Sequence, residues 1–95
     1  MKIKIKDSFY ARLAGQVEYI AHDSPGRARK FKNDIIREIR SILNNPYKHR
    51  QSIYFDDVTI RDLIFKGYTV VFRINEEDQV IEVFGFVKYQ EKAED

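Results

Sequence analysis

The chain has 95 residues, with 17 Lys and Arg against 15 Asp and Glu, so its net charge is +2 and its pI is about 8.9. This length makes one domain with a single modest core. Disulfides and thiolate chemistry are excluded because the sequence has no cysteine. The N-terminal M-K-I-K-I-K lacks the apolar segment of a secretory signal, and no apolar run reaches membrane-spanning length. We therefore expect a cytoplasmic protein, whose charge permits nucleic-acid contact without requiring it.

A short strand and two helices are predicted first. Lys and Ile alternate over residues 2–6, which is typical of a lysine-guarded edge strand. Asp7 or Ser8 caps a first helix, and residues 24–25, Ser-Pro, end it and start a second one. The second helix ends at residues 44–46, Asn-Asn-Pro, and has a basic outer face of the kind that is most often only solvated. The apolar stripes consist of Phe9, Leu13, Val17, Ile20 and Ala21, and of Ala28, Phe31, Ile35, Ile39 and Ile42.

Three strands are predicted over residues 58–65, 68–74 and 80–88, where β-branched and aromatic residues dominate. Lys66-Gly67 reads as a two-residue hairpin loop, because glycine can adopt a positive φ. The polar stretch 75–79 reads as a five-residue loop. The order β-α-α-β-β-β predicts an α+β domain, with a helical hairpin on one face of an antiparallel sheet.

These two loops set a register that divides the sheet into two apolar faces. Phe65 faces Tyr68, and Ile74 faces Val80. We expect the helices to cover the face with the larger aromatic area. That face carries Leu63, Phe65, Tyr68, Val70, Phe72, Ile74, Val80, Phe84 and Phe86, with Arg61 and Glu82 near its end. The open face, turned away from the helices, carries Ile60, Asp62, Ile64, Thr69, Val71, Arg73, Ile81, Val83, Gly85, Val87 and Tyr89.

The open face would expose more apolar area than a monomer usually does. A partner should therefore cover it, either an amphipathic or extended segment of another protein or a second copy of the chain. The domain is predicted to span residues 1–89, followed by a polar tail over residues 90–95. The apolar residues expected to bind the partner are Ile60, Ile64, Val71, Ile81, Val83 and Val87.

Candidate chemistry is sparse. His22 and His49 lack the clustered ligands that a metal needs, and neither a glycine-rich phosphate loop nor a Ser/His/acid set occurs, so no metal or cofactor is expected. Residues 47–50, Tyr-Lys-His-Arg, set cations beside an aromatic ring, as single-stranded nucleic-acid sites do. A polar surface loop would have the same composition, and both interpretations stay open.

Two cations lie inside apolar strands, and another residue pair ends the last strand. Pairing of Arg61 with Glu82, or of Arg73 with Asp62, explains these arginines as well as ligand binding does. Residues 88–89, Lys-Tyr, form the remaining candidate pair. A tyrosine there acts as an acid or base only if its pKa falls well below about 10.

With these elements in place, the sequence resembles the RelE/ParE superfamily of bacterial type II toxins over about residues 2–89. The combination is more specific than any single piece: Ser-Pro before a helix, Pro after it, and R-x-L before a Gly-Tyr strand. The segments that carry it are Y-I-A-H-D-S-P-G-R-A-R-K-F (19–31), I-R-S-I-L-N-N-P (39–46), I-R-D-L-I-F-K-G-Y-T-V-V-F-R-I (60–74) and V-I-E-V-F-G-F-V-K-Y (80–89).

The resemblance implies the superfamily fold, a cognate antitoxin and one of two targets. RelE-like members are ribosome-dependent endonucleases of messenger RNA that use basic residues on the sheet and no metal. ParE-like members inhibit DNA gyrase and are not nucleases. Aligned on Gly67-Tyr68, the basic positions of RelE-like members fall at Ile60, Asp62, Thr69 and Tyr89, all on the open face. Because these side chains cannot clamp phosphate as Arg and Lys do, we favour the ParE-like interpretation.

Two alternatives remain, so enzymatic activity stays open: a RelE-like endonuclease acting on the ribosome and mRNA, and a toxin-fold binding module without toxicity. The open-face apolar residues named above become the candidates for antitoxin binding. No catalytic residue is assigned, unless the chain is a ribonuclease, in which case Arg73, Lys88 and Tyr89 are the candidates. The candidates for target binding are Arg61, Arg73, Lys48, Arg50, Lys88 and Tyr89.

Overall fold

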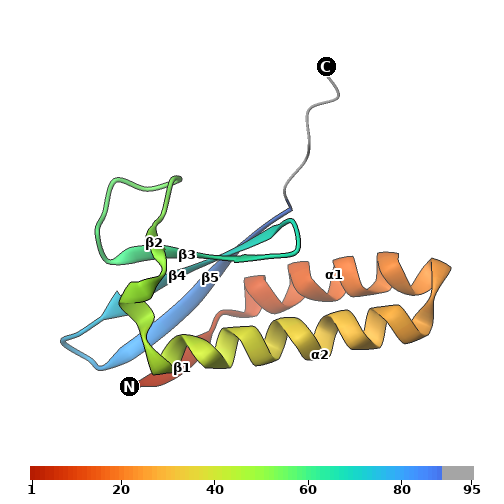
Figure 1. Ribbon diagram of the computed structural model, residues 1–95, viewed down its shortest axis with the longest axis horizontal. Coiled ribbons are helices and arrows are strands. Elements are labelled where there is room, and N and C mark those ends of the chain that lie inside the picture. Colours follow the sequence, from red (N-terminus) through yellow and green to blue (C-terminus); the bar gives the residue numbers. More distant parts are fainter. Residues whose placement is uncertain (89–95) are drawn as a thin grey trace, which may run out of the picture.

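The computed structural model describes residues 1–88, and its elements follow the predicted order with one added strand (Figure 1). The sheet has five strands in the order β1-β5-β4-β3-β2. The α+β class is confirmed, but the sheet is mixed, because β1 pairs parallel to β5. The elements are β1 (Lys2–Ile5), α1 (Asp7–Asp23), α2 (Pro25–Ser41), two 3-10 turns (Ile42–Asn44 and Pro46–Lys48), β2 (Arg50–Gln51), β3 (Ile60–Phe65), β4 (Tyr68–Asn75) and β5 (Val80–Lys88).

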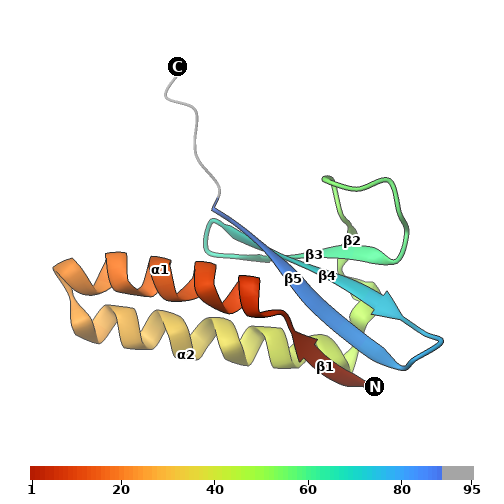
Figure 2. The same ribbon diagram turned by 180° about the vertical axis from the view of Figure 1, so that it is seen from behind.

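The two helices form a hairpin on one face of the sheet, and the segment between β2 and β3 lies on the other side (Figures 1 and 2). The start of α2 is as predicted: the Ser24 hydroxyl accepts a hydrogen bond from the backbone N–H of Arg27 at 3.2 Å, and Pro25 begins the helix. The predicted cap of α1 is wrong, since Lys6 holds that position without a side-chain bond. Asp7 lies in the first turn, where its charge favours the helix dipole.

The β3–β4 hairpin forms as predicted. Lys66 and Gly67 both have positive φ, 48° and 84°, as a type I′ turn requires. This turn sets the pairs Phe65 with Tyr68 and Leu63 with Val70. The face of these strands that was expected under the helices is therefore the one that packs on them.

The register of β5 differs from the prediction at its start. Asn75 pairs with Val80, so the β4–β5 loop has four residues rather than five. Ile81 therefore pairs with Ile74 and faces the helices, as does Val83 two residues on. Both residues are fully buried in the core, and their predicted place on the open face is wrong.

A β-bulge corrects the alternation later in β5. Val83 pairs with Phe72, but Gly85 pairs with the next residue back, Val71, which leaves Phe84 as an extra residue. Because the short loop and the bulge each shift the register by one residue, their effects on side-chain direction cancel. Phe86 accordingly faces the helices, as predicted.

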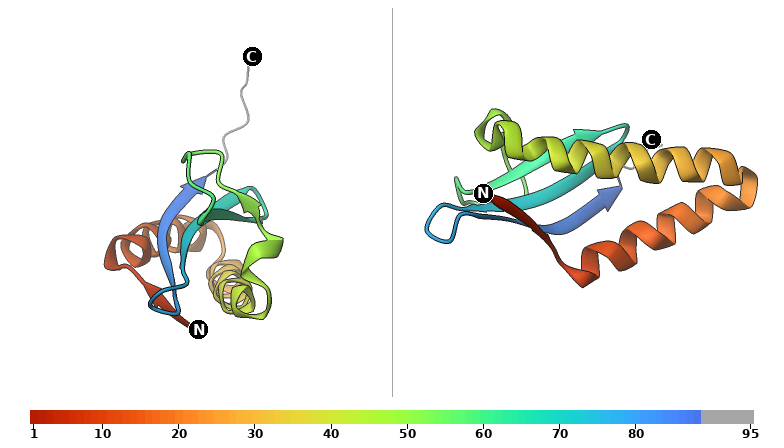
Figure 3. Two further views of the ribbon diagram at one scale, coloured as in Figure 1. Left: turned by 90° about the vertical axis from the view of Figure 1, so that its left-hand side faces the viewer. Right: turned by 90° about the horizontal axis from the view of Figure 1, so that it is seen from below.

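The core lies between the helices and the sheet, and aromatic contacts join the two layers. The Phe86 ring packs edge-on against Phe9 of α1 at 5.5 Å and stacks on Tyr68 at 5.3 Å between centroids. Figure 3 shows the two helices diverging beneath the sheet from the turn that joins them. The buried cluster consists of Phe9, Leu13, Ile35, Ile39, Ile42, Leu63, Val70, Phe72, Ile74, Ile81, Val83 and Phe86.

We predict that Gly85→Ala destabilises the fold by about 1–3 kcal/mol, because the bulge brings the two strands too close for a side chain. A Cβ at Gly85 would lie 2.8 Å from the Cβ of Val71. Gly15→Ala is the control, since nothing lies within 4 Å of a Cβ there; this helix-interior change should stabilise by about 0.5–1 kcal/mol. Urea unfolding measures both, and an unchanged midpoint for Gly85→Ala would show that the bulge is absent in solution.

Candidate functional site

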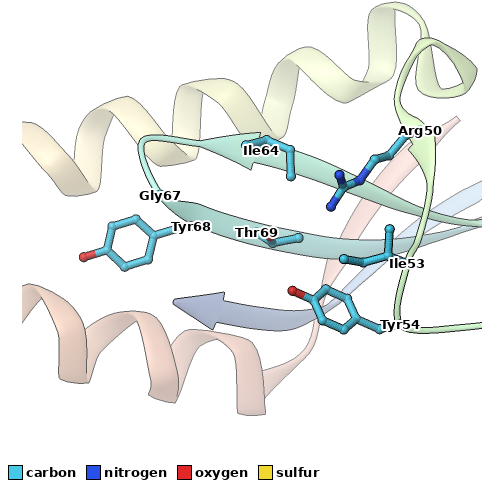
Figure 4. Close-up of a pocket in the computed structure, with 7 residues that line it drawn as sticks. All are labelled: Arg50, Ile53, Tyr54, Ile64, Gly67, Tyr68 and Thr69. Carbon is cyan, nitrogen blue, oxygen red and sulfur yellow. The ribbon is translucent and has the colours of Figure 1, made fainter. Parts of the chain in front are cut away.

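A pocket of about 370 Å³ lies on the open face, between the segment after β2 and the β3–β4 hairpin (Figure 4). Figure 4 shows Arg50, Ile53 and Tyr54 on one side of it, with Ile64 and Thr69 on the strands opposite. Apolar surface, hydroxyl groups and one guanidinium therefore meet in a single depression. The complete lining is Arg50, Ile53, Tyr54, Ile64, Gly67, Tyr68 and Thr69.

The wall of the pocket is fixed by Asp62, whose carboxylate is buried at 1% exposure. Its Oδ2 accepts hydrogen bonds from Arg50 Nε at 3.3 Å, Arg50 Nη2 at 3.1 Å and the backbone N–H of Ile53 at 3.1 Å. Arg50 lies opposite Asp62 in the β2–β3 register, which explains why a charge is tolerated inside β3. The Arg50 side chain is 47% exposed, so it reaches both the buried carboxylate and the pocket.

The segment between β2 and β3, residues 52–59, lies over the sheet, and we call it the lid. The backbone N–H of Ser52 donates to the carbonyl of Ile60 at 2.7 Å, and Phe55 packs edge-on against Phe84 at 5.7 Å. Asp57 accepts from the backbone N–H and hydroxyl of Thr59, and these bonds lower the pKa of the carboxyl. The aromatic pair Tyr54-Phe55 is the sequence feature from which the packing of this segment on the sheet could have been predicted.

This lid reduces the apolar area of the open face. Ile60 and Val71 keep their predicted face but are 2% exposed. Ile64 is 53% exposed in the pocket, and Val87, which pairs with Thr69, is half-buried. Of the six predicted partner-binding residues, these last two are the ones that a partner can reach directly.

The arginines inside the strands make structural contacts that differ from the predicted ion pairs. Arg61 donates to the carbonyls of Val58 at 2.8 Å and His49 at 2.9 Å, and it lies 5.1 Å from the centre of the Tyr47 ring. It therefore joins the two ends of the β2–β3 region, and the predicted pairing with Glu82 is wrong.

Arg73 pairs with Glu82 at 3.9 Å and Asp57 at 3.6 Å, and its predicted pairing with Asp62 is likewise wrong. Lys88 lies 5.3 Å from the centre of the Tyr19 ring on α1, so it points toward the helices. In the β4–β5 register Lys88 pairs with Tyr68 and Arg73 pairs with Glu82, so these two ribonuclease candidates lie at opposite ends of the strand pair and are not brought together. The third residue of that set, Tyr89, lies outside the described residues, and Lys48 is exposed in the second 3-10 turn.

Burial and hydrogen bonding shift the pKa values of several titratable groups near the site. Burial raises the pKa of the pocket residue Tyr68. A hydrogen bond to Glu76 at 2.9 Å raises the pKa of Tyr47. Burial lowers the pKa of His49, whose ring contacts Phe72 at 5.5 Å and does not line the pocket. Among residues 1–88, no group of three or more His, Cys, Asp or Glu side chains could hold a metal ion.

The three described positions that the resemblance aligns with basic residues of RelE-like proteins share the open face, as predicted. Ile60, Asp62 and Thr69 are all buried there, at 2%, 1% and 6% exposure. Asp62 also holds its own cation, Arg50, within 3.1 Å. These three positions therefore supply no cation to a phosphate, and Arg50 is a cation that lies beside them in the pocket.

Comparisons with known proteins identify a family by sequence and a shared fold by structure. The family model described as "ParE toxin of type II toxin-antitoxin system, parDE" matches residues 3–92. A solved structure described as "Chromosomal ParDE TA system from P. aeruginosa" has a chain that superposes with a TM-score of 0.76 at 16% identity. The match covers 95% of this chain and 97% of that chain, and at this identity it shows the fold. No curated protein matches in sequence. Neither helix of the described chain is long and apolar enough to span a bilayer.

We predict that Arg50→Ala lowers the free energy of unfolding by about 3 kcal/mol, because it leaves the Asp62 carboxylate buried without a counterion. Adding Asp62→Asn should recover part of this loss, since a neutral amide can still accept from Ile53 and needs no cation. Arg29→Ala, on the outer face of α2, is the control and should change stability by less than about 0.5 kcal/mol. Chemical denaturation measures all three. Equal, small effects of Arg50→Ala and Arg29→Ala would mean that Asp62 does not depend on Arg50.

Proposed function

The chain belongs to the ParE toxin family of type II toxin–antitoxin systems, and on that basis we propose that it arrests bacterial growth by inhibiting DNA gyrase until a cognate antitoxin binds it. Support for gyrase rather than the ribosome comes mainly from one observation. The positions where RelE-like endonucleases use cations hold Ile60, Asp62 and Thr69, all buried. The RelE-like alternative would need another cation cluster, yet Arg73 and Lys88 are directed to different parts of the molecule.

We propose that the antitoxin covers the open-face pocket. A segment that inserts one apolar side chain against Ile64 and Ile53 and places a carboxylate beside Arg50 would fit its lining. The hydroxyl groups of Tyr54 and Thr69, which also line the pocket, offer further hydrogen bonds. Val87 extends the apolar surface beyond the pocket, because it pairs with Thr69 in the neighbouring strand.

We predict that expression of the chain alone arrests growth and that co-expression of its antitoxin restores it. The purified chain should inhibit supercoiling by gyrase and should leave messenger RNA intact in a reconstituted translation system. Both assays use the same protein preparation.

Two outcomes would contradict this proposal. Ribosome-dependent cuts, lost in Arg73→Ala, would establish the RelE-like alternative. Normal growth with abundant folded protein would leave a toxin-fold binding module without toxicity.

We predict that Ile64→Lys weakens antitoxin binding at least about tenfold, because it places an ammonium group in an apolar contact next to Arg50. Val58→Lys is the matched control, since Val58 is equally apolar, is 64% exposed and does not line the pocket. Calorimetric titration measures binding, and thermal unfolding verifies that both variants fold. Unchanged affinity for Ile64→Lys would place the antitoxin elsewhere. Light scattering on the chain without antitoxin tests whether a second copy covers the pocket instead.

A further inference from the structure

The outer face of α2 carries charge of a single sign. The helix contains six cations and two carboxylates, a net charge of +4, although the whole chain has only +2. Between Arg27 and Arg40, every exposed position except Asn33 holds a cation. The neighbouring helix α1 differs, since its exposed positions mix Asp, Glu, Arg, Tyr and Ala. A face that is only solvated usually carries both signs interspersed, so this segregation is informative. The cations are Arg27, Arg29, Lys30, Lys32, Arg37 and Arg40.

The carboxylates of α2 leave this outer face uncompensated. Asp34 is buried and accepts from Lys30 and Arg37, both at 2.8 Å. The bond from Lys30 is the main cause that lowers the pKa of Asp34. A third cation, Lys66 of the β3–β4 turn, lies 3.8 Å from the same carboxylate. The side chains of Lys30 and Arg37 remain about 70% exposed, so their charges still face solvent.

The other four cations of α2 make no ion pair within residues 1–88. The second carboxylate of the helix, Glu38, is half-buried on the side of His49 rather than on the outer face. Arg27, Arg29, Lys32 and Arg40 thus present charges that neither carboxylate of the helix neutralises. Four of the six cations are arginine, whose planar group forms paired bonds to phosphate.

The face is suited to a polyanion rather than to a protein surface. A stable protein interface needs buried apolar anchors, usually aromatic, at its centre. Between Arg27 and Arg40 the apolar residues of α2 are turned inward, and none is exposed. Arg29 and Arg40 lie 11 positions apart, about 16 Å along a helix, so the charges follow a line rather than surround a pocket. A sugar–phosphate backbone is a line of charge of the opposite sign.

We propose that this basic face of α2 binds the phosphate backbone of double-stranded DNA. The choice of duplex DNA rests on the proposed function, because gyrase acts while it holds a DNA segment. The helices and the segment between β2 and β3 lie on opposite sides of the sheet (Figure 1), and that segment lines the open-face pocket, so DNA contact and antitoxin binding use different surfaces. The contact reads no base sequence, and its affinity depends strongly on salt.

The test is the binding of a fluorescent 25-base-pair duplex to the purified chain, measured by anisotropy at several salt concentrations without gyrase. Arg29→Gln/Arg40→Gln should weaken binding about tenfold or more. It should also reduce the slope of log affinity against log salt concentration by about two, because two fewer phosphates are neutralised. Lys2→Gln/Lys4→Gln is the matched control: it also lowers the net charge to zero, but at the edge strand β1, where both lysines are exposed. It should change the affinity less than twofold. Thermal unfolding of both variants confirms that they fold.

Three results would overturn the proposal. An equal loss in both variants would mean that net charge alone drives binding. No measurable binding by the wild-type chain at low salt would remove DNA as the ligand. Competition by a poly-glutamate peptide as strong as by duplex DNA, lost in Arg29→Gln/Arg40→Gln, would assign the face to an acidic protein. Because gyrase is absent from the assay, DNA binding by a chain that fails to inhibit supercoiling would count against the proposed function and leave this inference standing.

Discussion

The buried carboxylate of Asp62 makes the contacts on which the open-face side of the molecule depends. It lies inside an apolar strand and receives two bonds from Arg50 and one from the backbone of Ile53. Through these bonds it holds the β2–β3 segment over the sheet, which buries Ile60 and Val71 and shapes the pocket. A charge at this depth is stable only when it is paired and hydrogen-bonded, so the pocket wall and the carboxylate require each other.

This arrangement separates two surfaces of different chemistry. On the open face, the lid covers most of the apolar area and leaves a small mixed pocket with one guanidinium. On the helix side, the apolar stripes are turned into the core, and the outer face of α2 carries six cations. A short partner segment suits the first surface, and a polyanion suits the second. The proposed antitoxin contact uses the first surface, and the proposed DNA contact uses the second.

Local signals in the sequence predicted the features that depend on neighbouring residues. Ser24-Pro25 marks the start of α2, and Lys66-Gly67 sets the β3–β4 register, because capping and turn geometry are fixed within a few residues. The start of β5 was predicted wrongly, since the loop length and the bulge depend on pairing across the sheet, between Asn75 and Val80 and between Val71 and Gly85. The lid was not predicted, because it is held by contacts between residues far apart in the sequence, such as Phe55 with Phe84. Asp62 was predicted to pair with Arg73, but its partner Arg50 lies 12 residues earlier, in a two-residue strand too short to recognise.

Hydrogen exchange on the toxin, alone and bound to its antitoxin, tests most directly whether the open-face pocket is where the toxin is neutralised. Mass spectrometry of peptides from residues 50–58 and 63–70 reports on the lid and the hairpin, and peptides from α2 report on the basic face. The account predicts slower exchange in the first two regions on antitoxin binding, with α2 unchanged. Slower exchange confined to α2, with the lid and hairpin unaffected, would contradict it.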